Sequence, residues 1–320
     1  MSETDSYVIQ TQGLSKSYKK IEALKPLKLT VRPNSIFGFL GPNGAGKTTT
    51  IKLLLGLIRP TGGSATVFGK DIVQESIAIR ARVGYLPQEP RFYEHMTARQ
   101  IFRYTARFYF KGPAGEIEKR VEETLELVGL ADKADRPIKS FSGGERQRVG
   151  IGQAQVNYPD LLILDEPAAS LDPMGRRDVL EVMGRLQKHT TVFYSTHILN
   201  DVQKVSDTVA ILNHGELVEH GPIEELLAGG EGTAYNVTLK GDTVSAQARL
   251  ARQEWVSDIR SKERNGSTIW TVSVSDQAVA EAQLLRLLLA DEQLVVTEFK
   301  RKEYELEEVF MNIVEANNEQ

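Results

Sequence analysis

Gly41-Pro42-Asn43-Gly44-Ala45-Gly46-Lys47-Thr48 is the stretch of sequence that decides the fold. It matches G-x-x-x-x-G-K-[ST] and lies between an apolar run at 35–40, which reads as a strand, and a segment of helical length at 48–58. Glycines allow backbone N–H groups to turn inward around phosphate oxygens, and the following helix directs the positive end of its dipole at the same anion. The stretch therefore predicts a phosphate-binding loop rather than a glycine-rich turn that matches by chance.

The predicted nucleotide site is this loop together with the residue after it. Lys47 can reach the β- and γ-phosphates, and the Thr48 hydroxyl can ligate Mg²⁺. We expect the following residues to bind the nucleotide: Gly41, Pro42, Asn43, Gly44, Ala45, Gly46, Lys47, Thr48 and Thr49.

A second segment supplies carboxylates for the same site. The apolar run Leu161–Leu164, typical of a buried parallel strand, is followed directly by Asp165 and Glu166. At the end of such a strand Asp165 can hold magnesium, usually through water, and Glu166 can polarise an attacking water as general base. Taken alone, the run is equally a strand that enters an acidic turn, and the upstream phosphate loop favours the catalytic interpretation.

A third segment, Phe141-Ser142-Gly143-Gly144-Glu145, leads directly into a helix. Ser142 can cap that helix, and the two glycines expose its N-terminal amides. Taken alone, this segment indicates no more than a capped helix. The phosphate loop, however, already gives the chain one anion-binding helix N-terminus. One triphosphate needs only one such terminus on each of its faces, so a capped helix alone leaves this second terminus unexplained.

With these motifs in this order, the chain resembles the ATP-binding cassette (ABC) ATPases over about residues 5–225. The resemblance implies ATP and Mg²⁺ as cofactors and makes Ser142, Gly143 and Gly144 part of the family's signature. Phe141 and Glu145 stand where the family has Leu and Gln, and Ala168 stands where it often has Thr. These departures do not alter the expected activity, which is ATP hydrolysis.

The resemblance also implies roles for single residues outside these motifs. Gln88 is placed like the Q-loop glutamine that contacts Mg²⁺ and the catalytic centre, and His197 like the histidine that contacts the γ-phosphate. Asp172 belongs to a segment similar to the family's D-loop, and Tyr18 is placed like the aromatic that stacks on adenine. A plain loop glutamine, a structural histidine and a packing tyrosine are the alternatives for Gln88, His197 and Tyr18.

A partner chain is also implied by the resemblance. In this family two cassettes pack head to tail, and each ATP lies between the phosphate loop of one and the signature of the other. Because this sequence carries one cassette, we expect a homodimer, with a heterodimer as the alternative. The chain is then the energy-supplying subunit of a membrane transporter, of an export or drug-efflux type, with a separate transmembrane permease as partner.

Strands alternate with helices along the first part of the chain, which predicts an α/β fold with a mainly parallel sheet. This P-loop NTPase cassette is expected at 1–228, with a helical subdomain at about 89–157. Beyond a glycine-rich linker, residues 233–320 read as β-α-β-β-α-β, a small split-βαβ, ferredoxin-like α+β domain. A last amphipathic helix is expected at 306–314.

Composition excludes several other kinds of protein. The 320 residues include no cysteine, so neither disulfides nor Cys-ligated metal sites are possible. From Glu231 onward 10 Lys and Arg face 16 Asp and Glu, a net charge of −6, so we expect no nucleic-acid partner. No apolar run approaches the roughly 20 residues of a spanning helix, and the N-terminus has no signal-peptide core. We therefore expect a peripheral location on the cytoplasmic side of the cell membrane, through the permease.

Other functions fit these features less well. A non-transport cassette ATPase of translation or DNA maintenance is the main alternative, but such members carry two cassettes or a long coiled-coil insertion. A P-loop kinase or GTPase would leave the Ser142 segment unexplained. For the C-terminal domain, a stabilising or dimerising role is expected ahead of a regulatory ligand site.

Overall fold

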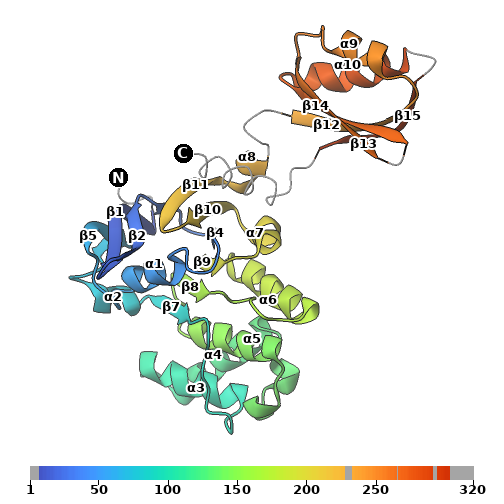
Figure 1. The fold of residues 1–320 in the computed structure, drawn as a ribbon. Helices are drawn as coiled ribbons and strands as arrows, with labels where there is room; N and C mark the ends of the chain where they lie inside the picture. Colours follow the sequence, from blue (N-terminus) through green and yellow to red (C-terminus); the bar gives the residue numbers. More distant parts are fainter. Residues whose placement is uncertain (1–6, 228–232, 265, 291–293, 303–320) are drawn as a thin grey trace. The chain divides into compact units, whose positions relative to one another are not determined.

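The computed structural model describes residues 7–227, 233–264, 266–290 and 294–302, and it divides the chain into two compact units, 1–223 and 224–320 (Figure 1). Each unit is described by itself. The expected linker at 228–232 and the expected last helix at 306–314 lie outside the described residues. The functional domain boundary between 228 and 233 stays a prediction.

The centre of the first unit is a sheet in which β10, β4, β9, β8 and β7 run parallel in that order. One antiparallel strand, β11, borders β10. Every residue of β4, β8 and β9 is buried, because helices or a second sheet cover both faces. The expected mainly parallel sheet is confirmed. Its strands are β4 (Ile36–Leu40), β7 (Val83–Leu86), β8 (Leu161–Asp165), β9 (Thr191–Thr196), β10 (Thr208–Asn213) and β11 (Glu216–Pro222).

A smaller antiparallel sheet completes the first unit and shares one apolar core with the central sheet. Gly63, near the start of β5, must be glycine where this strand passes the irregular part of β1, because its φ is 68° and a Cβ there would lie 2.0 Å from the carbonyl oxygen of Gly13. The strands of this sheet are β1 (Ile9–Tyr18), β2 (Ile21–Leu27), β3 (Thr30–Val31), β5 (Gly62–Val67) and β6 (Lys70–Asp71).

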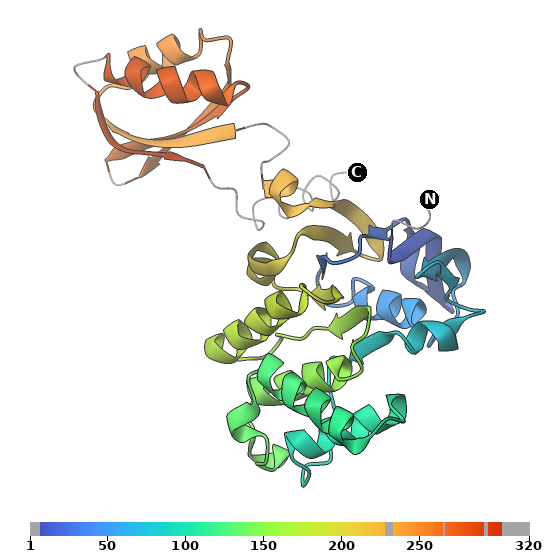
Figure 2. The same cartoon turned by 180° about the vertical axis from the view of Figure 1, so that it is seen from behind.

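Three helices, α3 to α5, form a group at one end of the first unit, at the place expected for the helical subdomain (Figures 1 and 2). Thr97 and Gln100 form a reciprocal capping box that fixes the start of α3. The helices of the unit are α1 (Lys47–Leu54), α2 (Ser76–Arg80), α3 (Ala98–Tyr109), α4 (Ala114–Leu127), α5 (Gly143–Gln155), α6 (Pro173–Leu186) and α7 (Leu199–Val205), with 3₁₀ turns η2 (Ala131–Lys133) and η3 (Ile138–Ser140).

Helix α8 (Ile223–Leu227) includes the division between the units, and after it the second unit forms a four-stranded antiparallel sheet in the order β13-β14-β12-β15. Its elements follow one another as β-α-β-β-α-β, and both helices lie on one face of the sheet (Figure 2). The second unit has its own apolar core, in which Trp270 is fully buried. The elements are β12 (Thr233–Lys240), α9 (Val244–Leu250), β13 (Val256–Arg264), β14 (Ser267–Val274), α10 (Gln277–Leu289) and β15 (Val295–Arg301).

In the part of the chain that the structure describes, no helix is both long and apolar enough to cross a membrane.

The separate cores lead to a prediction about truncation. The apolar clusters of the two units share no residue, so a chain that ends at Ala228 is expected to keep a cooperative thermal transition and the helical circular-dichroism signal of the first unit. Loss of both on truncation would show that the first unit depends on the second.

Candidate functional site

The loop between β4 and α1 has a geometry that only glycine allows at its last position. Gly46 has φ of 103°, and a Cβ there would lie 2.5 Å from the carbonyl oxygen of Ala23. The Gly41 N–H donates to the carbonyl oxygen of Thr196 at 3.1 Å, which ties the start of the loop to the end of β9. No side chain caps α1, and its first turn has no acidic residue. The N-terminal amides of α1 are thus available to an anion without competition from a capping or acidic side chain.

A cavity of about 320 Å³ lies against this loop. It brings together segments that are far apart in the sequence, since Gln88 follows β7 and Glu166 follows β8. Ala23 of β2 also lines the cavity, and nothing in its residue type had marked it. The lining residues are Ala23, Asn43, Gly44, Ala45, Gly46, Lys47, Thr48, Thr49, Gln88 and Glu166.

Lys47 and Glu166 form a buried ion pair at the floor of this cavity. The Lys47 Nζ lies 3.1 Å from Glu166 Oε1, and the two side chains are 6% and 5% exposed. The same Nζ donates to the carbonyl oxygens of Gly41 at 2.6 Å and Pro42 at 3.1 Å. All of these contacts offset the desolvation of the ammonium group.

The Glu166 backbone is held in a left-handed conformation, with φ of 52°. This conformation is unfavourable for a residue with a side chain, and such strain is found at functional sites. The Glu166 N–H donates to the Ser195 carbonyl oxygen at 3.2 Å and to the Ser195 hydroxyl at 3.0 Å. The second carboxylate oxygen, Oε2, lies 2.9 Å from His197 Nδ1. The carboxylate is therefore fixed between Lys47 and His197.

Asp165 is held next to the loop from two sides. It is 1% exposed, and its Oδ1 accepts hydrogen bonds from Thr48 Oγ1 at 3.2 Å and Ser195 Oγ at 2.5 Å. Burial, and secondarily the charge of Asp165, raise the pKa of Tyr85 to about 12, so this tyrosine stays neutral. Ser195 was missed from the sequence, although a polar residue that ends the apolar strand 191–195 could have marked it.

Tyr18 differs from the other expected nucleotide-binding residues in its position. It is the last residue of β1, its side chain is 45% exposed, and it does not line the cavity. The Lys16 ammonium lies 5.0 Å from the centre of its ring, a cation–π distance. Its role in stacking on a base stays a prediction.

The Ser142 segment does not reach this cavity either. Ser142 caps α5 by accepting from the Glu145 N–H at 3.3 Å, and the Glu145 carboxylate accepts from the Ser142 N–H at 2.8 Å. Burial of the Glu145 carboxylate raises its pKa, but hydrogen bonds from Lys133 and Ser142 outweigh burial and leave the pKa lowered. Ser142 and Gly143 are exposed. The segment is thus a second helix N-terminus, open to a binding partner.

Asp172, the remaining expected site residue, caps α6. Its Oδ1 accepts from the Gly175 N–H at 2.7 Å. Gly175 in turn lies against the first turn of α5, since a Cβ on Gly144 would be 2.8 Å from the Gly175 Cα. The Asp172 loop and the Ser142 segment are therefore in direct contact.

Comparisons with known proteins agree with this geometry. A family model described as ABC transporter matches residues 24–169. The chain is 36% identical to the uncharacterized ABC transporter ATP-binding protein YxlF of Bacillus subtilis, over 97% of this chain and 100% of YxlF. It is 30% identical to the linearmycin resistance ATP-binding protein LnrL of the same species, over 96% of this chain and 98% of LnrL.

A solved structure is similar to a large part of this chain. The structure of cbiO1 from Clostridium perfringens, part of the ABC transporter complex cbiONQ, has a TM-score of 0.65 and 28% identity, over 70% of this chain and 92% of cbiO1.

The contact between α5 and α6 yields a prediction. Gly144→Ala is expected to lower the melting temperature, because the added methyl group meets backbone that cannot move aside, at a cost of about 1–3 kcal/mol. The control is Gly184→Ala inside α6, where a Cβ meets nothing within 4 Å. This substitution is expected to stabilise the helix by up to about 1 kcal/mol. Equal rises in melting temperature for both variants would contradict the close contact.

Proposed function

The chain belongs to the family of ABC transporter ATP-binding proteins, whose members bind and hydrolyse ATP, and on that premise we propose which of its residues carry out each step. The observation that supports the assignment is the array Lys47–Glu166–His197 beside the uncapped N-terminus of α1. It combines a cation and free amides for phosphate oxygens with a carboxylate for an attacking water.

Lys47 and the loop bind the triphosphate in this proposal. The loop amides from Asn43 to Thr49 surround the phosphates, and the Lys47 ammonium exchanges its contact with Glu166 for phosphate oxygens. This exchange has a second effect, because it releases a Glu166 oxygen that the lysine otherwise engages. Glu166 thereby becomes available as a base only after nucleotide has bound.

The residues near Asp165 fit a magnesium ion. Mg²⁺ is usually bound by one or two carboxylates together with substrate phosphates. The Thr48 hydroxyl and the Asp165 carboxylate are 3.2 Å apart, and Gln88 lines the same cavity. Among the described residues no group of three or more His, Cys, Asp and Glu side chains could hold a metal by itself, as expected for an ion that shares its ligands with ATP. The ion would neutralise charge on the β- and γ-phosphates.

Glu166 acts as general base. It accepts a proton from a water molecule whose oxygen forms the new bond to the γ-phosphorus, while the bond to the β-phosphate oxygen breaks and ADP leaves. His197, on Oε2, keeps the carboxylate oriented and contacts the γ-phosphate. Tyr18 stacks on the adenine.

A homodimer provides the partner for the second helix N-terminus. In it Ser142, Gly143 and Gly144 contact the γ-phosphate of ATP bound by the other copy, and Asp172 lies at the same interface. Two observations support this proposal. Ser142 and Gly143 are exposed, and the cavity of the same chain is lined by none of the four residues. ATP then joins the copies, and its hydrolysis separates them.

The Glu166→Gln variant tests these assignments. We expect hydrolysis to fall about 100-fold or more, because the base is lost while ATP binding survives. With Mg-ATP the variant should elute as a dimer in size-exclusion chromatography. Lys47→Ala added to it should abolish the dimer, and Glu126→Gln on the exposed surface of α4 should behave as wild type. A Glu166→Gln chain that binds ATP and stays monomeric would contradict the proposed dimer.

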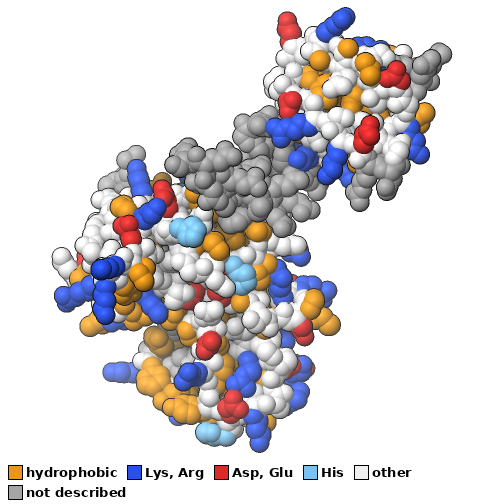
Figure 3. Space-filling model, in the orientation of Figure 1, with side chains coloured by type: hydrophobic (Ala, Val, Ile, Leu, Met, Phe, Trp, Pro, Cys, Tyr) orange, Lys and Arg blue, Asp and Glu red, His pale blue; other side chains and the backbone are white. Residues whose placement is uncertain are grey.

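We also propose that the chain powers a separate transmembrane permease from the cytoplasmic side of the membrane. A groove of about 410 Å³ lies between β7, α3 and α5, beside the Gln88 loop. Exposed aromatic side chains of α3, Tyr104, Phe108 and Tyr109, extend from it, and Tyr109 belongs to both (Figure 3). Such a patch is typical of a protein interface. We assign it to a short amphipathic cytoplasmic segment of the permease.

Export is the proposed direction of transport, because LnrL, which is similar along the whole chain, is named for resistance to linearmycin. The similarity to YxlF and LnrL includes the second unit, which we propose to be a ferredoxin-like domain with a stabilising or dimerising role. The alternative of translation or DNA maintenance finds no support among these relatives.

Substitutions on α3 test the permease surface. Phe108→Glu and Tyr109→Glu should each lower the yield of a polytopic membrane protein that co-purifies with the tagged chain about tenfold or more, because a charge on the patch opposes burial. Basal ATP hydrolysis should not change. Val244→Glu, an exposed apolar residue of the second unit, is the control. An equal yield of the co-purified protein in all three variants would show that α3 does not form part of the permease interface.

A further inference from the structure

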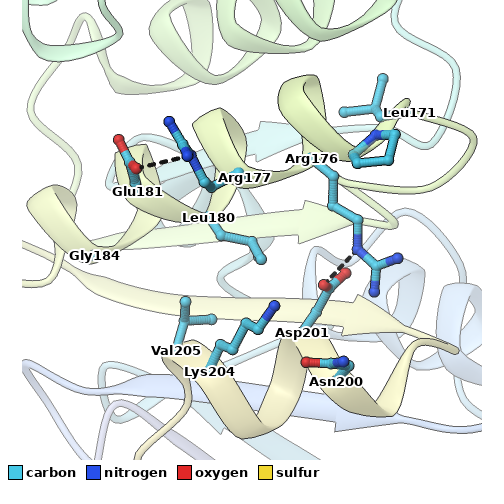
Figure 4. Close-up of a pocket in the computed structure, with 11 residues that line it drawn as sticks. Leu171, Arg176, Arg177, Leu180, Glu181, Gly184, Asn200, Asp201, Lys204 and Val205 are labelled. Atoms are coloured by element: carbon cyan, nitrogen blue, oxygen red, sulfur yellow. Dashed lines mark hydrogen bonds and ion pairs between the residues drawn. The ribbon is translucent and has the colours of Figure 1, made fainter.

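A buried ion pair joins α6 to α7 (Figure 4). Arg176 of α6 donates through Nε to Asp201 Oδ1 of α7 at 2.6 Å, and the Asp201 side chain is 2% exposed. The other carboxylate oxygen, Oδ2, is buried and has no hydrogen-bond partner among the described residues. Arg176 is therefore the ion-pair partner of this buried carboxylate, with further attraction from the charge of Lys204.

Burial of the Asp201 carboxylate opposes its ionisation. Burial raises the pKa of Asp201, and the lowering by Arg176 is smaller, so the pKa stays above its usual value. The attraction thus does not fully offset the cost of burying the carboxylate. A pair with this balance is better explained by the geometry that it imposes than by its energy.

One end of the pair leads to the Ser142 segment. Arg176 is adjacent to Gly175, whose Cα would lie 2.8 Å from a Cβ on Gly144. Asp172, which caps α6, also binds the Gly175 N–H. A displacement of the first turn of α5 is therefore transmitted to the first turn of α6, because backbone meets backbone there.

The other end leads to the Lys47–Glu166–His197 array. The Asp201 N–H donates to the carbonyl oxygen of Ile198 at 3.2 Å, and Ile198 is the residue after His197. His197 Nδ1 lies 2.9 Å from Glu166 Oε2. Movement of Asp201 would therefore change the position of the histidine that orients the proposed base.

A cavity of about 570 Å³ flanks the ion pair between α6 and α7, with Leu180 and Val205 on facing sides (Figure 4). Because side chains do not fill this space, packing alone restricts the distance between these helices only loosely there. The ion pair then has a large influence on how far α7 lies from α6.

From these contacts we infer that Arg176 and Asp201 are positioning residues that couple the Ser142–Gly144 segment to His197. The inference rests on the proposed dimer, in which that segment contacts the partner's ATP. Engagement of the partner's nucleotide displaces α5 and α6, the ion pair carries the displacement to α7, and His197 aligns Glu166 over the chain's own ATP. Each site is thereby activated when the other is occupied.

Steady-state ATP hydrolysis by the full chain tests the coupling. For Arg176→Gln and Asp201→Asn we expect kcat to fall about 3- to 30-fold, the range of such coupling effects. The KM for ATP should stay within about twofold, since no residue that binds ATP is changed. The Hill coefficient, above one in the wild type, should fall to one. Arg176→Lys, which keeps the charge, should have a kcat and a Hill coefficient between those of Arg176→Gln and those of the wild type.

Controls separate coupling from other effects. Arg177→Gln breaks a pair within α6 alone, with Glu181 at 3.4 Å, and should leave kcat and the Hill coefficient unchanged. A wild-type Hill coefficient of one, or Arg176→Gln with a lower melting temperature but wild-type kcat and cooperativity, would overturn the inference. If Arg176→Gln does not fold, the same readouts from Arg176→Lys decide. Failure of Glu166→Gln to dimerise would instead refute the proposed function itself.

Discussion

The site depends on how a lysine and a glutamate are buried together. Taking either charge out of water costs several kcal/mol, and only close partners offset that cost. Lys47 has two loop carbonyl oxygens and Glu166, and Glu166 has Lys47 and His197. The two loop carbonyls follow β4, Glu166 follows β8 and His197 follows β9, so the pair constrains the ends of these three strands at once.

The parallel sheet is the reason that these partners can meet. In an open parallel sheet the carboxyl ends of all strands lie at one edge, where ligands bind. The loop after β4, Glu166 after β8, His197 after β9 and Gln88 after β7 share that edge. Helices and the smaller sheet cover the two faces of this sheet, so its buried strands are largely apolar and polar residues gather where the strands end.

Sequence patterns predicted the parts of this arrangement that depend on residues close together along the chain. The phosphate loop, the acidic strand end and the parallel sheet follow from short motifs with a fixed spacing. Ala23 could not be found in that way, because no motif includes it and its place beside the loop depends on how the strands pair. Ser195 ends an apolar strand and so carried a weak signal, but its contact with Asp165 depends on the pairing of β8 with β9. The close approach of Gly144 and Gly175 depends on how α5 and α6 cross, which their separate sequences do not determine.

The two helix N-termini differ in a way that explains why ATP, rather than the protein surface alone, would join two copies. The start of α1 has no capping side chain and no acidic residue, so its amides and Lys47 favour an anion strongly. The start of α5 is already satisfied by Ser142 and by Glu145, whose negative charge opposes a second anion. In the proposed dimer a nucleotide would therefore bind first at α1. Its contact with α5 of the other copy would be weak by itself and would gain strength only from the whole interface, so association would be sensitive to the loss of a single phosphate.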